Sequence, residues 1–162
     1  MTTETLPIAI RRTQYAVFAV AAVHVVAIAL LLTHRDALHA GQPALHPGAD
    51  IDALTRAALL QSLIPHIVLA VVLPIRALRL ADRRRRSRVV LTVVMGLQVL
   101  AHATVPMAVR ELPGYGGWIV AVQAVSLVFE VGALAYLWSP SARAFFRSDR
   151  QPEPVREPAL AR

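Results

Sequence analysis

Four ionisable side chains are the residues of this sequence best placed to do chemistry, because each lies within a long apolar stretch. They are His24, His66, His102 and Glu130. An imidazole titrates near neutral pH and binds metals in its neutral form, whereas a carboxylate in an apolar setting is costly unless it is protonated or paired. We therefore expect a proton, a ligand or a cofactor to bind there. The alternative is that each histidine makes one interhelical hydrogen bond.

Other polar residues recur at helical spacing beside these four. Gln98, His102 and Pro106 follow the pattern i, i+4, i+8. Gln123, Ser126 and Glu130 follow the pattern i, i+3, i+7, and Ser62 and His66 are one turn apart. Such spacings place each set on one side of a helix. We predict an intramembrane polar site whose members are His24, His66, Gln98, His102, Gln123 and Glu130.

Three functions fit this set. The first is proton-coupled transport or small-ligand binding. A rise of about 1.5 Å per residue, counted from the cytoplasmic end of each span, gives the depth of each ionisable group in the membrane. From outside to inside the order is His102, His24, His66 and Glu130, in steps of about 3 Å. In a membrane electron-transfer protein, a b-type haem would be ligated by His24 with His66 or by His66 with His102. In a structural or regulatory membrane partner, the same residues would serve packing alone.

The apolar stretches that must position these residues have the length of membrane spans. The chain has 162 residues, 56% of them hydrophobic, and a mean hydropathy of +0.54. A spanning helix needs about 20 mostly apolar residues, and four stretches qualify, at about 13–33, 56–76, 89–109 and 117–138. The sequence thus predicts an all-α fold. The predicted fold is a four-transmembrane-helix antiparallel bundle over residues 13–138. An N-terminal arm (1–12) precedes the bundle, and a tail (139–162), predicted to be largely disordered from residue 148, follows it.

The placement of arginine predicts the orientation of the spans. All 17 basic residues are arginine, and fourteen of them fall in the N-terminal arm, the loop between the second and third stretches, and the tail. Because positive residues stay on the cytoplasmic side, we expect both termini and this middle loop in the cytoplasm, in a multi-pass protein of the bacterial cell membrane. The arginine-rich loop would then face anionic lipids. No basic stripe with interleaved aromatics is present, so nucleic acid is not an expected partner.

The two remaining connections differ in character. Residues 34–55 form the only sizeable external loop and contain His34, Asp36, His39, His46, Asp50 and Asp52. These residue types bind divalent metals, but their spacing fits no closed motif, and no metal site is predicted. Asp50 or Asp52 is expected to cap the second helix. The link at 112–117 is rich in glycine, which predicts that the third and fourth helices are neighbours.

Several protein classes are excluded by what the sequence lacks. Without lysine no retinal Schiff base can form, and without cysteine there is no disulfide or thiol chemistry. There is no phosphate-binding glycine loop, nucleophile elbow or zinc-protease motif, so we expect no enzymatic activity. The alanine-rich helix faces predict that the protein can self-associate.

Three segments together resemble a large group of uncharacterised small four-helix bacterial membrane proteins. They are the acidic run-in Asp50-Ile-Asp-Ala-Leu-Thr-Arg56, the basic turn before the third span, and the closing Leu137-Trp-Ser-Pro-Ser-Ala-Arg-Ala-Phe-Phe-Arg147. In that group the third span often opens with glycine and a Trp-Ala-Arg run, where this chain has Arg83-Arg-Arg-Arg-Ser-Arg88. The resemblance implies a fold and no particular activity.

Overall fold

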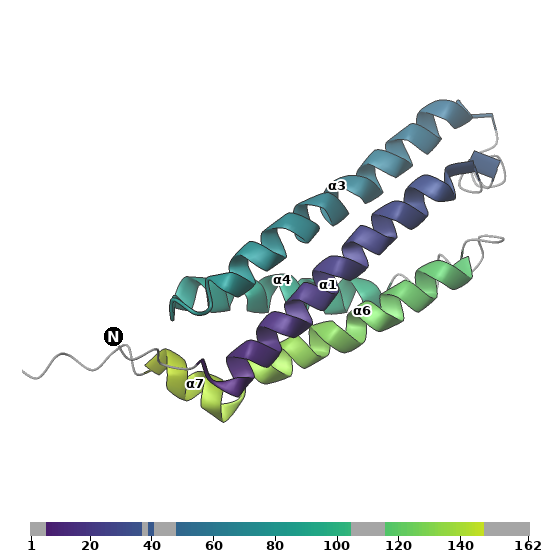
Figure 1. Cartoon of the computed structure of the whole chain (residues 1–162). Coiled ribbons are helices and arrows are strands. Elements are labelled where there is room, and N and C mark those ends of the chain that lie inside the picture. Colours follow the sequence, from purple (N-terminus) through teal and green to yellow (C-terminus); the bar gives the residue numbers. More distant parts are fainter. Residues whose placement is uncertain (1–5, 37–38, 41–47, 105–115, 148–162) are drawn as a thin grey trace, which may run out of the picture.

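The structure is a computed structural model, which describes residues 6–36, 39–40, 48–104 and 116–147. Over these residues the protein is helical. The four long helices are α1 (Ile8–Thr33), α3 (Ile51–Leu78), α4 (Arg85–Thr104) and α6 (Gly116–Leu137), and a short helix, α7 (Pro140–Arg147), follows the last of them (Figure 1). The all-α prediction is confirmed for the described part of the chain.

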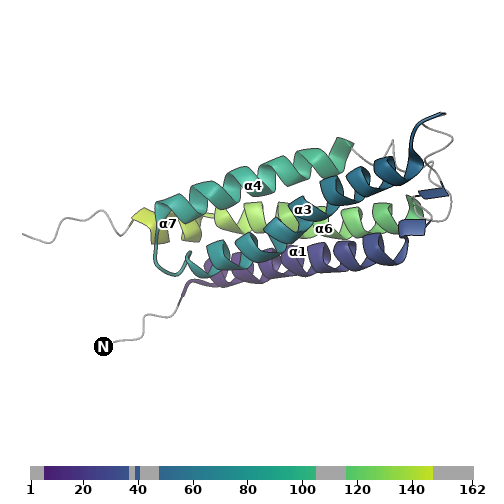
Figure 2. The same cartoon turned by 90° about the horizontal axis from the view of Figure 1, so that it is seen from above.

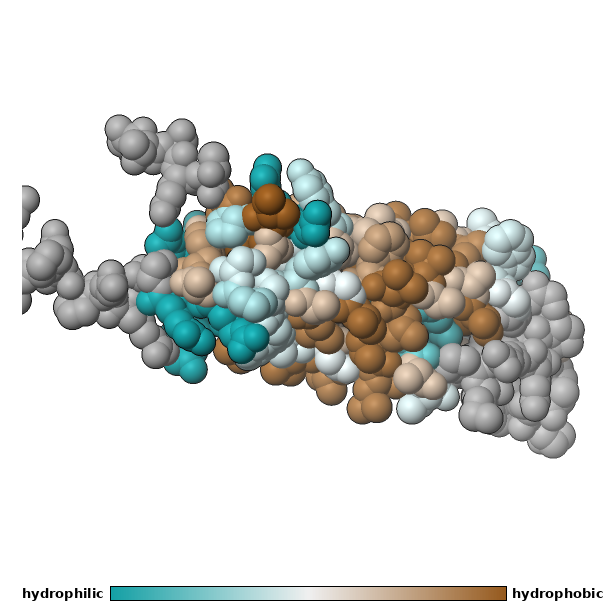
Figure 3. All heavy atoms as spheres, turned by 90° about the horizontal axis from the view of Figure 1, so that it is seen from below, coloured by the Kyte–Doolittle hydropathy of each residue, from teal (hydrophilic) through white to brown (hydrophobic). Residues whose placement is uncertain are grey.

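Each long helix is long and apolar enough to cross a membrane, as the sequence predicted. Many of their large apolar side chains point away from the protein, among them Val25 on α1, Ile64 on α3, Leu100 on α4 and Val128 on α6. On the face seen in Figure 3, brown, apolar residues cover most of the middle of the molecule, and most of the strongly hydrophilic residues lie towards the left of the view, the side on which Figure 1 shows α7. This distribution suits contact with lipid more than with water.

Helix α1 holds the assembly together, because it packs against both α3 and α6. Helix α4 packs mainly on α6, so the third and fourth predicted spans are neighbours, as expected (Figure 2). Small side chains let the helices approach closely: Ala16 and Ala21 on α1, Ala77 on α3 and Ala133 on α6 are all buried. Val17 of α1 is fully buried among them.

Helix α3 begins where the sequence predicted a cap. Asp50 precedes its first residue, and the side-chain Oδ1 accepts a hydrogen bond from the backbone N–H of Ala53 at 3.1 Å. The helix then continues for 28 residues through Pro65 and Pro74. Each proline removes one backbone hydrogen bond and so leaves a carbonyl for water or a polar side chain.

Helical structure extends beyond two of the predicted spans. Helix α4 begins at Arg85, so Arg85–Arg88 belong to its first turn and not to the middle loop. After α6, the segment 140–147 forms helix α7, which buries Ala142 and Phe146 and exposes Arg143. The predicted disorder from residue 148 and the predicted end of the third span at 109 lie outside the described residues.

Candidate functional site

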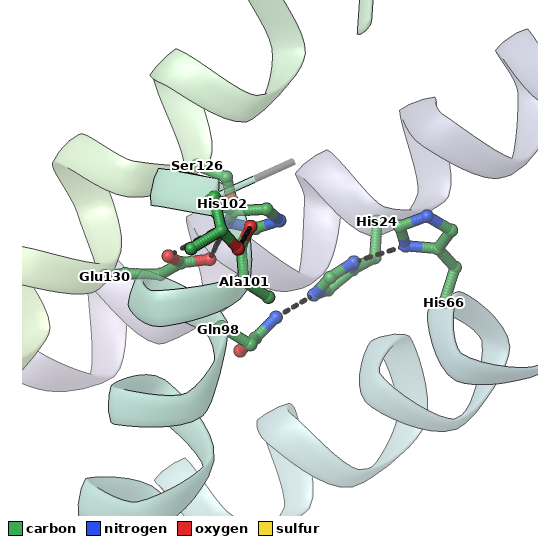
Figure 4. A network of polar contacts seen from close by, with 8 residues as sticks. His24, His66, Gln98, Ala101, His102, Ser126 and Glu130 are labelled. Atoms are coloured by element: carbon green, nitrogen blue, oxygen red, sulfur yellow. Dashed lines mark hydrogen bonds and ion pairs between the residues drawn. The ribbon is translucent and has the colours of Figure 1, made fainter. Parts of the chain in front are cut away.

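His24 is the centre of a hydrogen-bonded chain that joins three helices. Its side chain on α1 is buried, and its Nδ1 lies 2.8 Å from Nδ1 of His66 on α3. On the other side of the ring, Nε2 of His24 accepts a hydrogen bond from Nε2 of Gln98 on α4 at 2.6 Å. Figure 4 shows the three side chains in this order, with His24 between its two partners. Three of the predicted site residues therefore form one connected group.

The direction of these hydrogen bonds fixes where the protons lie. Because the amide of Gln98 donates to Nε2 of His24, a neutral His24 carries its proton on Nδ1. That proton is donated to Nδ1 of His66, so a neutral His66 carries its own on Nε2. A ligand that approaches His66 at Nε2 would then meet a hydrogen-bond donor. A substitution of Gln98 would alter this donor, because Gln98 is linked to His66 by two hydrogen bonds through His24.

Glu130 is the centre of a second group. Its side chain is fully buried, and Oε1 accepts a hydrogen bond from the hydroxyl of Ser126, one turn earlier on α6, at 2.8 Å. His102 on α4 approaches the same carboxyl group, with Nδ1 3.0 Å from Oε1 and 3.1 Å from Oε2. A buried carboxyl group with two such partners has the hydrogen bonds that burial requires.

The contact between His102 and Glu130 corrects the predicted order of depths. That order placed these two residues at opposite ends of the series, whereas their side chains touch. His24 and His66 are adjacent in the predicted order, and they touch as well. The physical reason is the direction of the side chains, since a Cα–Cβ bond leans towards the N-terminus of its own helix. His102 leans back towards the Arg85 end of α4, and Glu130 leans towards the Gly116 end of α6, so the two meet.

The two groups share a cavity of about 310 Å³. His24, His66, His102 and Ser126 lie on its wall together with Gln123, the remaining predicted site residue. Its other lining residues are mostly apolar, and they come from the C-terminal half of α1, the middle of α3 and the first turns of α6: Val23, Ala27, Leu30, Leu31, Ser62, Pro65, Ile119 and Val122. The size is at the lower end of the range for small-molecule pockets.

Two amide oxygens near these groups have no hydrogen-bond partner among the described residues. They are Oε1 of Gln98 and Oε1 of Gln123, and both are buried. A buried acceptor without a donor costs free energy, of the order of 1–3 kcal/mol. Donors from a bound solute or from water would remove that cost. Gln123 lies on the cavity wall, although its Oε1 is itself buried, so its amide group would have to turn to meet a solute there.

Apolar side chains fill the core between this site and the end of the molecule that carries α7. They include Val20 on α1, Leu73 on α3, Met95 on α4 and Leu137 on α6, each with at most 1% of its surface exposed. No described residue adds an ionisable side chain to this layer. The polar site therefore ends on this side at a closely packed apolar layer.

The haem interpretation stays a prediction. With Nδ1 of His24 and Nδ1 of His66 only 2.8 Å apart, the two rings bond to each other. An iron between them would need a separation of roughly twice a metal–imidazole bond of about 2 Å, so the two helices would have to move apart. In the part of the chain between α1 and the start of α3, Nε2 of His39 lies 3.0 Å from Oδ1 of Asp52. No group of three metal-ligating side chains occurs in the described ranges.

Ser126 and the cavity itself were not among the predicted site members. Ser126 has a signal in the sequence, its i, i+4 spacing to Glu130, whereas the cavity depends on how four helices pack.

In comparisons with known proteins, no family model, no curated protein and no solved structure matches the chain. The geometry of the site is therefore the basis for a functional proposal.

Proposed function

We propose that this chain is a multi-pass protein of the bacterial cell membrane that binds a small hydrogen-bonding solute in a pocket within an antiparallel four-helix bundle. The termini and the middle loop lie in the cytoplasm, and the pocket occupies the outer half of the bundle. The observation that carries the proposal is the cavity of about 310 Å³ with three histidines on its wall and the buried Glu130 hydrogen-bonded to two of its lining residues.

The chemistry of the wall favours a solute that donates hydrogen bonds. The unpartnered oxygen of Gln123 accepts only, and the carboxyl group of Glu130, which lies buried behind the wall residues His102 and Ser126, accepts when ionised. A solute would reach either group only after a side-chain rearrangement. A small amine or amide matches both, with its carbon atoms against Ala27 and Val122. An anionic solute of the same size would meet the carboxylate with the wrong charge.

Solute binding is expected to be linked to protons. Glu130 is buried, and His102 is its titratable partner. A charged carboxylate in an apolar interior needs a positive partner, which here would be either a protonated His102 or a cationic solute. A cationic solute and a proton on His102 would then compete to neutralise the same carboxylate. This competition is the physical basis for coupling between the solute and the proton.

Passage of the solute to the cytoplasm would require a rearrangement of the helices. The apolar layer that includes Val20 and Met95 supports a pocket open towards the outer side and closed towards the inner one. Transport by this protein would therefore alternate between two arrangements, whereas a binding protein would stay in one. The proposal of a binding site holds in either case.

A test uses three solutes of similar size on the protein purified in mild detergent: methylammonium, acetamide and acetate. We expect methylammonium and acetamide to raise the unfolding temperature and acetate to leave it unchanged, because only the first two supply donors. Glu130→Gln should abolish the response to methylammonium and spare most of the response to acetamide.

A matched control is Gln61→Leu, which changes an exposed glutamine on α3 outside the cavity. It should leave both responses intact. If none of the three solutes stabilises the wild-type protein, or if Glu130→Gln responds to methylammonium as the wild type does, the proposed site is wrong. Proteoliposomes loaded with a pH-sensitive dye then decide between binding and transport, since only transport makes an applied methylammonium gradient change the internal pH in a Glu130-dependent way.

A further inference from the structure

A cluster of arginines lies at the opposite end of the molecule from the cavity, where α4 begins and α7 ends. Its central member is Arg88, which shares the first turn of α4 with Arg85. The Arg88 guanidinium also packs on the ring of Phe146 of α7, the helix that carries Arg143 and Arg147. We call these four residues the arginine cluster. Among the described residues no carboxylate forms an ion pair with any of the four.

Arg88 is held in place by aromatic rings. Its guanidinium carbon lies 4.0 Å from the centre of the Trp138 ring and 5.2 Å from the centre of the Phe146 ring. Trp138 is itself fixed, because its Nε1 donates a hydrogen bond to Oγ1 of Thr92 at 3.0 Å. A guanidinium stacked in this way keeps its planar donor edge in one orientation, which a flexible lysine would not do.

The cluster has more positive charge and more donors than the protein satisfies. Nε and Nη2 of Arg88 are buried and have no hydrogen-bond partner among the described residues, so no described acceptor balances the charge of Arg88. The other three arginines are exposed. Four guanidinium groups that repel one another are stable together when an anion lies between them, and planar guanidinium donors match the oxygens of a phosphate.

The surface next to the cluster is apolar. Val89 and Val93 follow Arg88 along α4, and about half of each side chain is exposed, 50% and 54% respectively. Trp138 is exposed at the same level of the molecule, with 47% of its surface accessible, as is usual for a tryptophan at a membrane interface. A ligand that fits this surface has an anionic head and a hydrocarbon tail.

We propose that the arginine cluster binds the phosphate of an anionic phospholipid from the cytoplasmic leaflet, with an acyl chain lying along Val89 and Val93. The site is specific, unlike the general attraction of a basic loop to a charged surface. The inference rests on the membrane location proposed above but not on the cavity or its solute. It also gives helix α7 a role, since α7 supplies two of the four arginines and one of the two rings.

The two tryptophans of the chain allow a direct test. Trp138 lies at the cluster and Trp118 near the start of α6, so Trp118→Phe and Trp138→Phe give proteins that each report from one end. Both are reconstituted in vesicles of phosphatidylcholine that contain a small fraction of brominated phosphatidylglycerol or, in parallel, brominated phosphatidylcholine. We expect Trp138 to be quenched by the anionic lipid well beyond its mole fraction, and Trp118 to be quenched in proportion to it.

Substitutions in the Trp118→Phe protein identify the binding groups. Replacement of Arg85, Arg143 and Arg147 together by glutamine leaves the stacked Arg88 in place and should remove the excess quenching. Arg88→Lys keeps the charge and should weaken anionic-lipid binding by about fivefold, the effect of roughly one lost contact. Arg79→Gln removes one charge from an exposed arginine outside the cluster and should leave the binding unchanged.

The outcomes separate a lipid site from a free-phosphate site and from the absence of any site. Quenching of Trp138 by anionic lipid in proportion to its mole fraction, or unaltered excess quenching in the triple variant, would overturn the proposal. Displacement of the brominated anionic lipid by millimolar inorganic phosphate would assign the site to free phosphate instead. Quenching of both tryptophans by brominated phosphatidylcholine reports membrane insertion separately, so failure of the lipid site and failure of the membrane location are distinguishable.

Discussion

Nδ1 of His24 lies 2.8 Å from Nδ1 of His66, and this contact joins α1 to α3 at the wall of the cavity. Its contribution to stability can be measured with a double-mutant cycle of His24→Ala, His66→Ala and the double variant. Interhelical hydrogen bonds in membranes contribute about 0.6 kcal/mol on average and at most about 1.7. We expect a coupling free energy in this range from unfolding in mixed micelles, and a value near zero would mean that the two rings do not bond.

The two single variants of that cycle should differ. His24 has only 2% of its surface exposed and bonds through both ring nitrogens, so His24→Ala also leaves the amide of Gln98 without its acceptor. His66 is less buried and has one such contact. We expect His24→Ala to lower the free energy of unfolding more than His66→Ala, and equal losses would argue against the chain of three residues.

Glu130 is expected to stabilise the fold through its two partners. In Glu130→Leu the hydroxyl of Ser126 and Nδ1 of His102 lose their acceptor, which should cost about 1–3 kcal/mol in the free energy of unfolding. Glu130→Gln keeps one acceptor oxygen, so the loss should be smaller. The comparison is made by chemical unfolding in micelles, and a leucine variant more stable than the wild type would show that the group is retained for function at a cost in stability.

The sequence was sufficient for the helices because their signals are local. The length and apolarity of each stretch predicted four candidate spans, and the position of Asp50 before an apolar run predicted its cap on Ala53. Arginines alone did not mark the start of the third helix, because Arg85–Arg88 are helical although they are charged. Arginine has a good helix propensity and can extend its charge beyond an apolar helix end.

The pairing of side chains was not predictable in the same way. Spacing placed His102 and Glu130 on polar stripes, but the rotation of α4 against α6 decides that they meet, and that rotation depends on packed residues such as Met95 and Ala133. The stack of Arg88 on Trp138 likewise joins two residues that are far apart in the sequence. Such contacts are properties of the packed core.

The cavity predicts that a larger side chain at one position blocks solute binding without damage to the fold. Ala27 lies on the cavity wall, so Ala27→Leu should fill part of the space and abolish the thermal response to methylammonium and acetamide. Its own unfolding temperature should be unchanged or higher, because filling a cavity adds contacts. Ala22→Leu, at an exposed position of the same helix, is the control and should respond like the wild type.

The proposed orientation in the membrane predicts which positions a membrane-impermeant thiol reagent reaches in intact cells. The chain has no cysteine, so single cysteines can be introduced without any other change. Ala40, Ala81 and Ala144 are exposed small residues in the segment before α3, the middle loop and α7 respectively. Cysteine at position 40 should be labelled from outside, and cysteine at positions 81 and 144 should be labelled only after the cells are opened, because in the proposed orientation the arginines beside them keep these segments in the cytoplasm. The opposite pattern would invert the topology, and it would also place the arginine cluster at the outer leaflet and the cavity in the cytoplasmic half of the protein.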